Sequence, residues 1–250
     1  MTKTKYLFFV CFLLVVLFSQ CTKSFGQADE NLGAWYIYNG SYYVDPKVEL
    51  FFETQIRFYK PISNIEEFFL RPMANYHFSP LVFAGLGYSY GNSWTYADNK
   101  DDKERKTENR LILQAGLHHK ITRTKIQHRY RFEQRWFESG NRHRFRYRLQ
   151  VTIPINGKII EKGTFFVNVY DEIFISSKPE LAFDQNRLYV AGGYQFNKTL
   201  NLQIGYLYQS RATANFHRLQ FFRLIYPNQI HLNILLNVNE IYSRPYPYHH

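Results

Sequence analysis

The 250-residue chain carries 31 basic and 20 acidic side chains, a formal net charge of +11, and an aromatic content of 19 % that includes 21 Tyr and 23 Phe. Both cysteines, Cys11 and Cys21, lie within the first 26 residues, so the rest of the chain can form no disulfide and perform no thiol catalysis. Soluble domains seldom hold so many aromatic residues, whereas membrane barrels place Tyr, Trp and Phe on their lipid face and in interfacial girdles.

The first 26 residues have the pattern of a secretory signal peptide. Two lysines precede an apolar run over residues 6–18, and Ser24-Phe25-Gly26 supplies a small-residue cleavage site. The run is too short to cross a hydrocarbon core of roughly 30 Å as a helix. We therefore expect cleavage before Gln27. The alternative is lipid attachment at Cys21, although Leu17-Phe18-Ser19-Gln20 lacks the small residue that lipoprotein processing prefers.

Removal of this leader would leave a chain that fits a single domain. It would take away three lysines and no acid, which lowers the formal charge from +11 to +8. We predict a signal peptide over residues 1–26, a barrel over residues 27–242 and a short C-terminal tail over residues 243–250. A basic, exported chain is expected to meet outer-membrane lipid, the barrel-insertion machinery and small anionic solutes, and no nucleic acid.

Alternation of apolar and polar residues with a period of two runs through the whole chain and predicts strands. Between Lys47 and Tyr59, the even-numbered positions are apolar or Thr, whereas Glu49, Glu53 and Arg57 occupy the opposite face. The same pattern recurs along the rest of the chain. In chain order the expected strands lie near residues 32–39, 47–59, 65–78, 81–96, 110–118, 125–137, 144–153, 164–176, 188–196, 200–208, 216–226 and 230–238.

These segments predict an all-β fold, a single antiparallel transmembrane β-barrel of about 12 strands (10–12) in the outer membrane. No apolar stretch after the leader approaches the 18 residues that indicate a membrane helix. A barrel is expected because unpaired strand edges are not tolerated in lipid. The alternative is a soluble β-sandwich or lipocalin-like barrel, which would turn its apolar face inward.

The expected connections alternate between tight turns and longer loops. Ser79-Pro80, residues 121–124, Asn197-Lys198 and residues 227–229 are tight, whereas residues 97–108, 177–185 and 210–215 are longer. Membrane barrels have short turns on the periplasmic side and longer loops outside. We therefore expect the most polar connection, Ala97 to Glu108, to be a solvated external loop.

Arginines gather on the polar faces of two consecutive expected strands between Gln127 and Gln150. Their side chains would line the lumen close together, because neighbouring strands lie about 4.8 Å apart. Either they form a positive ladder that guides anions through a pore, or they pair with acids and fill a narrow barrel. The lumenal charge network that we predict comprises Arg129, Arg131, Glu133, Arg135, Arg142, Arg144, Arg146, Arg148 and Glu172.

Signals for an enzyme are weak, and we predict no catalytic, cofactor-binding or metal site. The serines lack the companion sequences of a hydrolase nucleophile. The pairs His118-His119 and His249-His250 have no obvious third metal ligand. The chain offers no phosphate-cradling glycine loop, and Gly85, Gly87 and Gly91 fall within an expected strand.

Several segments together resemble one family. They are Arg71-Pro72 with Tyr76, Gly85-Leu86-Gly87-Tyr88-Ser89-Tyr90, Glu108-Asn109-Arg110, His128-Arg129-Tyr130-Arg131-Phe132-Glu133-Gln134-Arg135 and Tyr170-Asp171-Glu172-Ile173-Phe174. The chain resembles an uncharacterised domain-of-unknown-function family of predicted outer-membrane barrels of Gram-negative bacteria. The resemblance implies fold and location but lends no catalytic residue. It also implies that Arg129, Arg131, Glu133, Arg135 and Glu172 belong to one internal network.

The sequence therefore favours a passive outer-membrane barrel, either a small-solute pore that could prefer anions or a structural surface barrel. Two alternatives come from other classes. A barrel hydrolase acting on lipid or surface polymer would need a serine within hydrogen-bond reach of a histidine at one rim. An adhesin or receptor would need large outer loops, and the expected loops are short.

Overall fold

The computed structural model describes residues 33–96, 103–177, 182–211 and 215–225, the last of these by its backbone alone. The expected signal peptide, the C-terminal tail, the strand over residues 230–238 and the His249-His250 pair lie outside the described residues. None of the described residues belongs to a helix, so the described part contains no helix able to cross a membrane.

The described residues form eleven strands, and the all-β prediction is confirmed. The strands are β1 (Gly33–Tyr43), β2 (Val48–Lys60), β3 (Ser63–His77), β4 (Val82–Tyr96), β5 (Lys103–Ile121), β6 (Thr124–Phe137), β7 (Gly140–Pro154), β8 (Phe165–Ser176), β9 (Ala182–Gln195), β10 (Leu200–Arg211) and β11 (Asn215–Ile225). The preferred count of twelve is not confirmed, because the twelfth expected strand lies outside the described residues.

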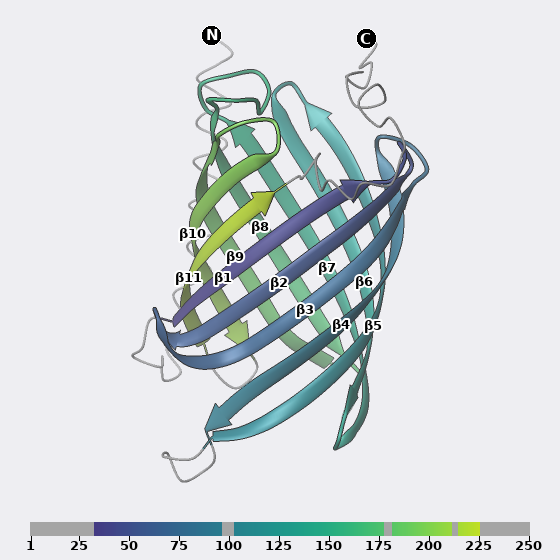
Figure 1. Cartoon of the computed structure of the whole chain (residues 1–250), viewed down its shortest axis with the longest axis vertical. Coiled ribbons are helices and arrows are strands. Elements are labelled where there is room, and N and C mark those ends of the chain that lie inside the picture. Colours follow the sequence, from purple (N-terminus) through teal and green to yellow (C-terminus); the bar gives the residue numbers. More distant parts are fainter. Residues whose placement is uncertain (1–32, 97–102, 178–181, 212–214, 226–250) are drawn as a thin grey trace, which may run out of the picture.

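Each strand pairs with its neighbour in the chain, and the sheet closes on itself (Figure 1). The pairings between consecutive strands are antiparallel, but β1 and β11 close the barrel in parallel, Gly33 opposite Arg218 and Gly40 opposite Ile225. The seam between these described strands therefore departs from the wholly antiparallel barrel that the sequence predicts. The reason is geometric: a closed sheet of consecutive antiparallel strands has antiparallel end strands only if their number is even.

The strands turn polar residues inward and apolar residues outward. In β2, Glu49, Glu53 and Arg57 are buried in the lumen, whereas Leu50 and Phe52 on the alternate positions are exposed. The same distribution continues around the barrel. Outward apolar side chains that are at least 38 % exposed include Leu50, Phe52, Ile56, Leu86, Leu111, Leu113, Phe145, Ile173, Val190 and Ile204.

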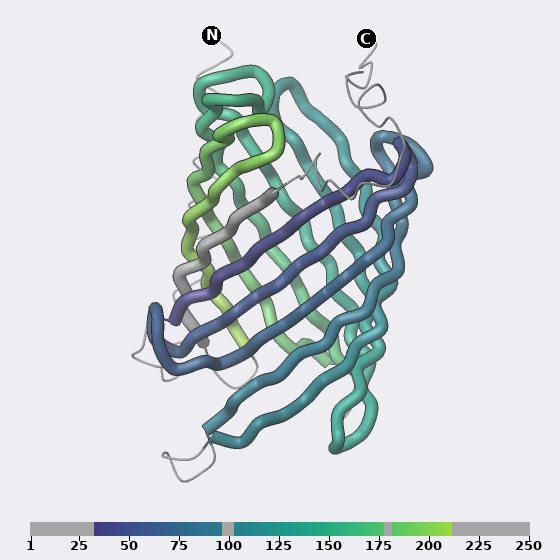
Figure 2. The backbone as a smooth tube through the Cα atoms, in the orientation of Figure 1, coloured from purple at the N-terminus to yellow at the C-terminus, as the bar shows by residue number. Residues whose placement is uncertain are grey.

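The connections lie at the two ends of the barrel, where Figure 2 shows them joining tilted strands. The end that carries residues 61–62 and 138–139, where β4 ends and β5 starts, is also the end at which β1 starts. The predicted loop from Ala97 to Glu108 is too long, because Lys103–Glu108 continue β5 and pair with β4. At the opposite end the connections over residues 44–47, 78–81, 122–123 and 196–199 are short, but residues 155–164 form a longer one.

Glycines along β4 let the side chains of β3 lie across it. A Cβ on Gly85 would come within 2.1 Å of Asn75 Oδ1, and one on Gly87 within 2.4 Å of the Met73 side chain. Real side chains do not approach so closely, so a larger residue at either position would displace its neighbour. As a result, β3 contributes to the same interior layer as β5, although β4 separates the two strands.

Candidate functional site

The charged layer of the lumen is built on the hairpin of β6 and β7. Gly140 adopts a φ of +111° at the start of β7, a conformation that favours glycine and permits the tight turn after Phe137. The hairpin register places arginine directly opposite arginine three times, in the pairs Arg129 with Arg148, Arg131 with Arg146, and Arg135 with Arg142. Like charges in such positions destabilise a sheet unless other groups compensate them.

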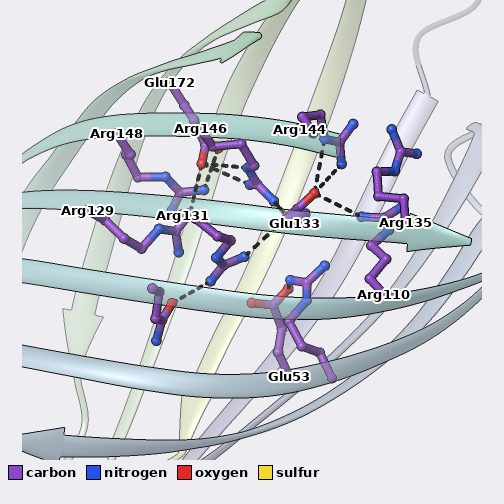
Figure 3. A network of polar contacts seen from close by, with 12 residues as sticks. Glu53, Arg110, Arg129, Arg131, Glu133, Arg135, Arg144, Arg146, Arg148 and Glu172 are labelled. Atoms are coloured by element: carbon purple, nitrogen blue, oxygen red, sulfur yellow. Dashed lines mark hydrogen bonds and ion pairs between the residues drawn. The ribbon is translucent and has the colours of Figure 1, made fainter. Parts of the chain in front are cut away.

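Glu172 on β8 compensates three of these arginines. Its carboxylate accepts hydrogen bonds at 2.8 Å from Arg129 Nη2, Arg146 Nη2 and Arg148 Nη2 (Figure 3). The side chain of Glu172 has no exposed surface. Its position follows from the register, since Arg148 on β7 lies directly opposite Glu172. One buried carboxylate therefore ties together three consecutive strands.

Glu133 on β6 forms the second centre of the layer, and it too has no exposed surface. Arg144 Nη2 donates to Glu133 Oε2 at 2.7 Å, and Arg146 Nη1 donates to Glu133 Oε1 at 2.5 Å. Arg146 thus joins the Glu133 and Glu172 centres into one network. Arg144 also approaches Asp184 on β9 at 3.5 Å.

Glu108 on β5 is a third centre, although the sequence predicts a loop at this position. Its carboxylate accepts a hydrogen bond from Arg110 Nη2 at 2.6 Å and another from Arg135 Nη2 at 3.0 Å. Extending the alternation of Arg110 and Gln114 back by two residues would have placed Glu108 on the inner face. The charged residues that precede Glu108 are typical of a loop, and the sequence therefore predicts a strand that begins only at residue 110.

The layer extends to β2 and β3 across the glycines of β4. Arg71 on β3 is ion-paired with Glu53 on β2, and Gln114 on β5 donates to Asn75 at 2.7 Å. Arg131 Nη2 donates to Gln114 Oε1 at 2.9 Å. Side chains from β2 to β8 therefore form one continuous polar layer across the interior.

Aromatic rings hold several of the guanidinium groups against the wall. The Arg146 guanidinium lies 4.5 Å from the centre of the Phe174 ring, and that of Arg148 lies 4.1 Å from the Tyr170 ring. Arg187 on β9 lies between the Trp35 and Phe174 rings, at 4.8 and 4.7 Å. Stacking of this kind favours arginine over lysine, because the planar guanidinium can lie flat on a ring.

Of the nine residues predicted for the lumenal charge network, the structure brings eight into a single set of ion pairs and hydrogen bonds. Arg142 lies apart: its side chain is exposed near the hairpin turn, 5.4 Å from the Phe137 ring, with no ion pair to any described residue. It shares the alternation of its neighbours, but only two residue pairs, Trp136 with Asn141 and Phe137 with Gly140, separate it from the turn of the hairpin.

The histidines do not converge on a metal site within the described ranges. His118 faces the lumen beside Phe83, whereas the adjacent His119 stacks on His128 at 5.3 Å. The described residues hold no group of three or more His, Cys, Asp or Glu suited to a metal ion. They also show no hydrogen bond between a serine hydroxyl and a histidine ring; Ser177 Oγ accepts one only from the backbone N–H of His143.

Comparison with known proteins bears on the family alone. Residues 32–220 match a family described as a protein of unknown function (DUF2490). The chain belongs to this family. The predicted resemblance to an uncharacterised family is therefore confirmed, and the match includes the whole charged layer. No curated protein and no solved structure matches the chain.

Proposed function

We propose that the chain is an outer-membrane β-barrel whose interior is closed by its own side chains, and that its role is structural. The observation that carries the membrane location is the inverted distribution of side chains: charged residues are buried inside, and large apolar residues are exposed around the outside. Soluble proteins rarely expose apolar patches larger than a few hundred Å². A lipid environment would cover this surface.

Location is tested by fractionating cells that express the full chain and by gel mobility. A membrane barrel is expected in the outer-membrane fraction, and it should migrate faster when unheated than after boiling, because the closed barrel resists the detergent. Recovery as a soluble periplasmic protein would contradict the proposal.

The barrel is proposed to be closed because its charges are paired. Glu133 and Glu172 are fully buried, and they bind arginines from both strands of the β6–β7 hairpin. Fully buried side chains also reach inward from the rest of the wall, among them Ser89, Ile112, Phe174 and Leu207. Removing one partner of an ion pair buried to this degree lowers the free energy of unfolding by roughly 3–5 kcal/mol, because the other charge stays buried without compensation.

Recordings from planar bilayers test closure. The wild-type protein is expected to give no steady channel, with insertion verified by heat-modifiable mobility of the same sample. The specific observation in favour of a pore is the excess of arginine over glutamate inside the barrel. A steady conductance whose reversal potential in a salt gradient favours anions would therefore replace the structural role with an anion-preferring pore.

The proposal includes a twelfth strand over residues 230–238, where Ile230, Leu232, Ile234, Leu236 and Val238 alternate with polar residues. An even number of strands would let the ends of the sheet pair antiparallel, as in bacterial membrane barrels. The structure pairs Tyr36 directly with Phe221. If a further strand separates β1 from β11, the double variant Tyr36→Cys, Phe221→Cys should form no disulfide; rapid oxidation to an intramolecular disulfide would establish the eleven-strand closure.

We also propose that the barrel end at which β4 ends and β5 starts faces the periplasm, whereas the sequence predicts an external loop between these two strands. An exported chain enters the membrane from that side, and β1 starts at this end. Single cysteines test this, since both natural ones lie in the expected leader. A membrane-impermeant maleimide should label Lys158→Cys but not Ser139→Cys on intact cells, and the reverse labelling would invert the orientation.

A further inference from the structure

Arg131 differs from the other arginines of the charged layer in having no close carboxylate. Its cross-strand neighbours are Gln114 on β5 and Arg146 on β7. Arg146 takes both Glu133 and Glu172 as partners, whereas Arg131 Nη2 donates only to uncharged acceptors, the amide oxygen of Gln114 at 2.9 Å and the Met73 sulfur at 4.0 Å. The nearest approach of Arg131 to a carboxylate is 4.0 Å, from Nη1 to Glu133.

Hydrogen-bond donors without an acceptor gather around Arg131. The residue is only 4 % exposed, and neither its Nε nor its Nη1 finds a hydrogen-bond acceptor among the described residues. The Nε groups of Arg71, Arg129 and Arg148 are equally unsatisfied. Figure 3 shows Arg129, Arg131 and Arg148 directed into the same part of the lumen.

The whole layer also carries more positive than negative charge. It contains Arg71, Arg110, Arg129, Arg131, Arg135, Arg144, Arg146 and Arg148, against Glu49, Glu53, Glu108, Glu133, Glu172 and Asp184. Arginine does not lose its proton in proteins, so it cannot relieve this excess by becoming neutral. Burial of an unpaired charge is unfavourable unless a group of opposite charge accompanies it.

We propose that Arg131, with the neighbouring N–H groups of Arg71 and Arg129, binds one small inorganic oxyanion of the phosphate or sulfate class inside the barrel. Guanidinium groups approaching from two strands suit several oxygen acceptors on one compact anion better than they suit a spherical ion. The anion would satisfy the donors that no described residue satisfies, and it would offset the like charges of Arg131 and Arg146. A structural membrane barrel does not require such a ligand, so the site goes beyond the proposed function.

Calorimetric titration of the detergent-solubilised full-length mature protein with inorganic phosphate tests the site. Ionic strength is held constant with a bulky sulfonate salt. The wild type is expected to give saturable heat with one phosphate per chain, and Arg131→Gln should weaken the affinity at least tenfold. The matched control is Arg142→Gln, which removes an exposed arginine of the same strand pair and should bind phosphate as the wild type does.

Unfolding without phosphate separates a binding residue from a structural one. Arg131 has one carboxylate, 4.0 Å away, and lies directly opposite the like charge of Arg146. Arg131→Gln should therefore unfold at the same or a higher denaturant concentration than the wild type, and phosphate should stabilise only the wild type. The site is overturned if the wild type gives no saturable heat, if Arg131→Gln binds normally, or if Arg131→Gln is less stable without phosphate. Tighter binding of chloride than of phosphate would overturn the class of anion. Cell fractionation tests the outer-membrane location without phosphate, so failure of the anion site would leave that location unaffected.

Discussion

The two halves of the lumen wall fill the barrel by different chemistry. From β5 to β8 the inner face is charged, and Glu108, Glu133 and Glu172 hold arginines from several strands. From β8 through β10 and on β1, the buried cluster is mainly apolar and aromatic, with Tyr170 and Tyr189 rings 4.7 Å apart and Leu207 without exposed surface. Amides accompany it, as where Asn168 donates to Gln203 at 2.9 Å.

This difference implies different sensitivities in the two walls. The charged wall depends on its carboxylates, because removal of Glu133 or Glu172 leaves several buried arginines without their shared acceptor. The stability of the aromatic wall depends on the fit of its side chains, because they are close-packed and are not held together by ion pairs. Arg148 over Tyr170 and Arg187 between Trp35 and Phe174 lie where the two walls meet.

The largest effect is expected from Glu172→Gln in the charged wall. Three arginines would lose the charge of their shared acceptor, so the free energy of unfolding should fall by about 3–5 kcal/mol. Guanidinium chloride unfolding of the barrel in lipid vesicles, followed by tryptophan fluorescence, measures it. Glu104→Gln is the control, since it removes an exposed partner of Lys106 and should leave the midpoint unchanged. Equal effects of the two variants would show that burial of the network does not matter.

An intermediate effect is expected from Gly193→Ala in the aromatic wall. The added Cβ would come within 2.3 Å of the buried Phe166 ring, and such overpacking costs about 1–3 kcal/mol. The adjacent Gly192→Ala is a close control, because a Cβ there meets nothing within 4 Å. The same unfolding assay should separate these neighbours. If both variants behave alike, the packing described for this wall is incorrect.

The smallest effect is expected from Arg142→Gln, which marks the edge of the charged wall. Its exposed side chain has no ion pair to a described residue, so the free energy of unfolding should change by less than about 0.5 kcal/mol. Arg146 lies on the same face of β7, four residues further along the strand. Arg146→Gln would lose contacts to two carboxylates, so this variant should be strongly destabilised. A large loss from Arg142→Gln would extend the network to the rim.

The alternation of inward and outward residues along the strands predicts most members of the candidate site. Arg129, Arg131, Glu133 and Arg135 share one face because successive strand residues point to opposite sides. Arg142 shows the limit of this reasoning, since alternation gives the face but not the distance from the end of a hairpin. Glu108 shows another, because its polar neighbours suggested a loop until pairing with β4 extended the strand.

The sequence by itself determined the strands, their inward and outward faces and the approximate membership of the charged layer, because these depend on local geometry with a period of two. Only the tertiary structure decided which charges meet. Glu172 reaches three arginines through the register of β6, β7 and β8. The glycines of β4 let β3 and β5 touch across an intervening strand. Such contacts depend on register and on closure of the sheet, which no single segment encodes.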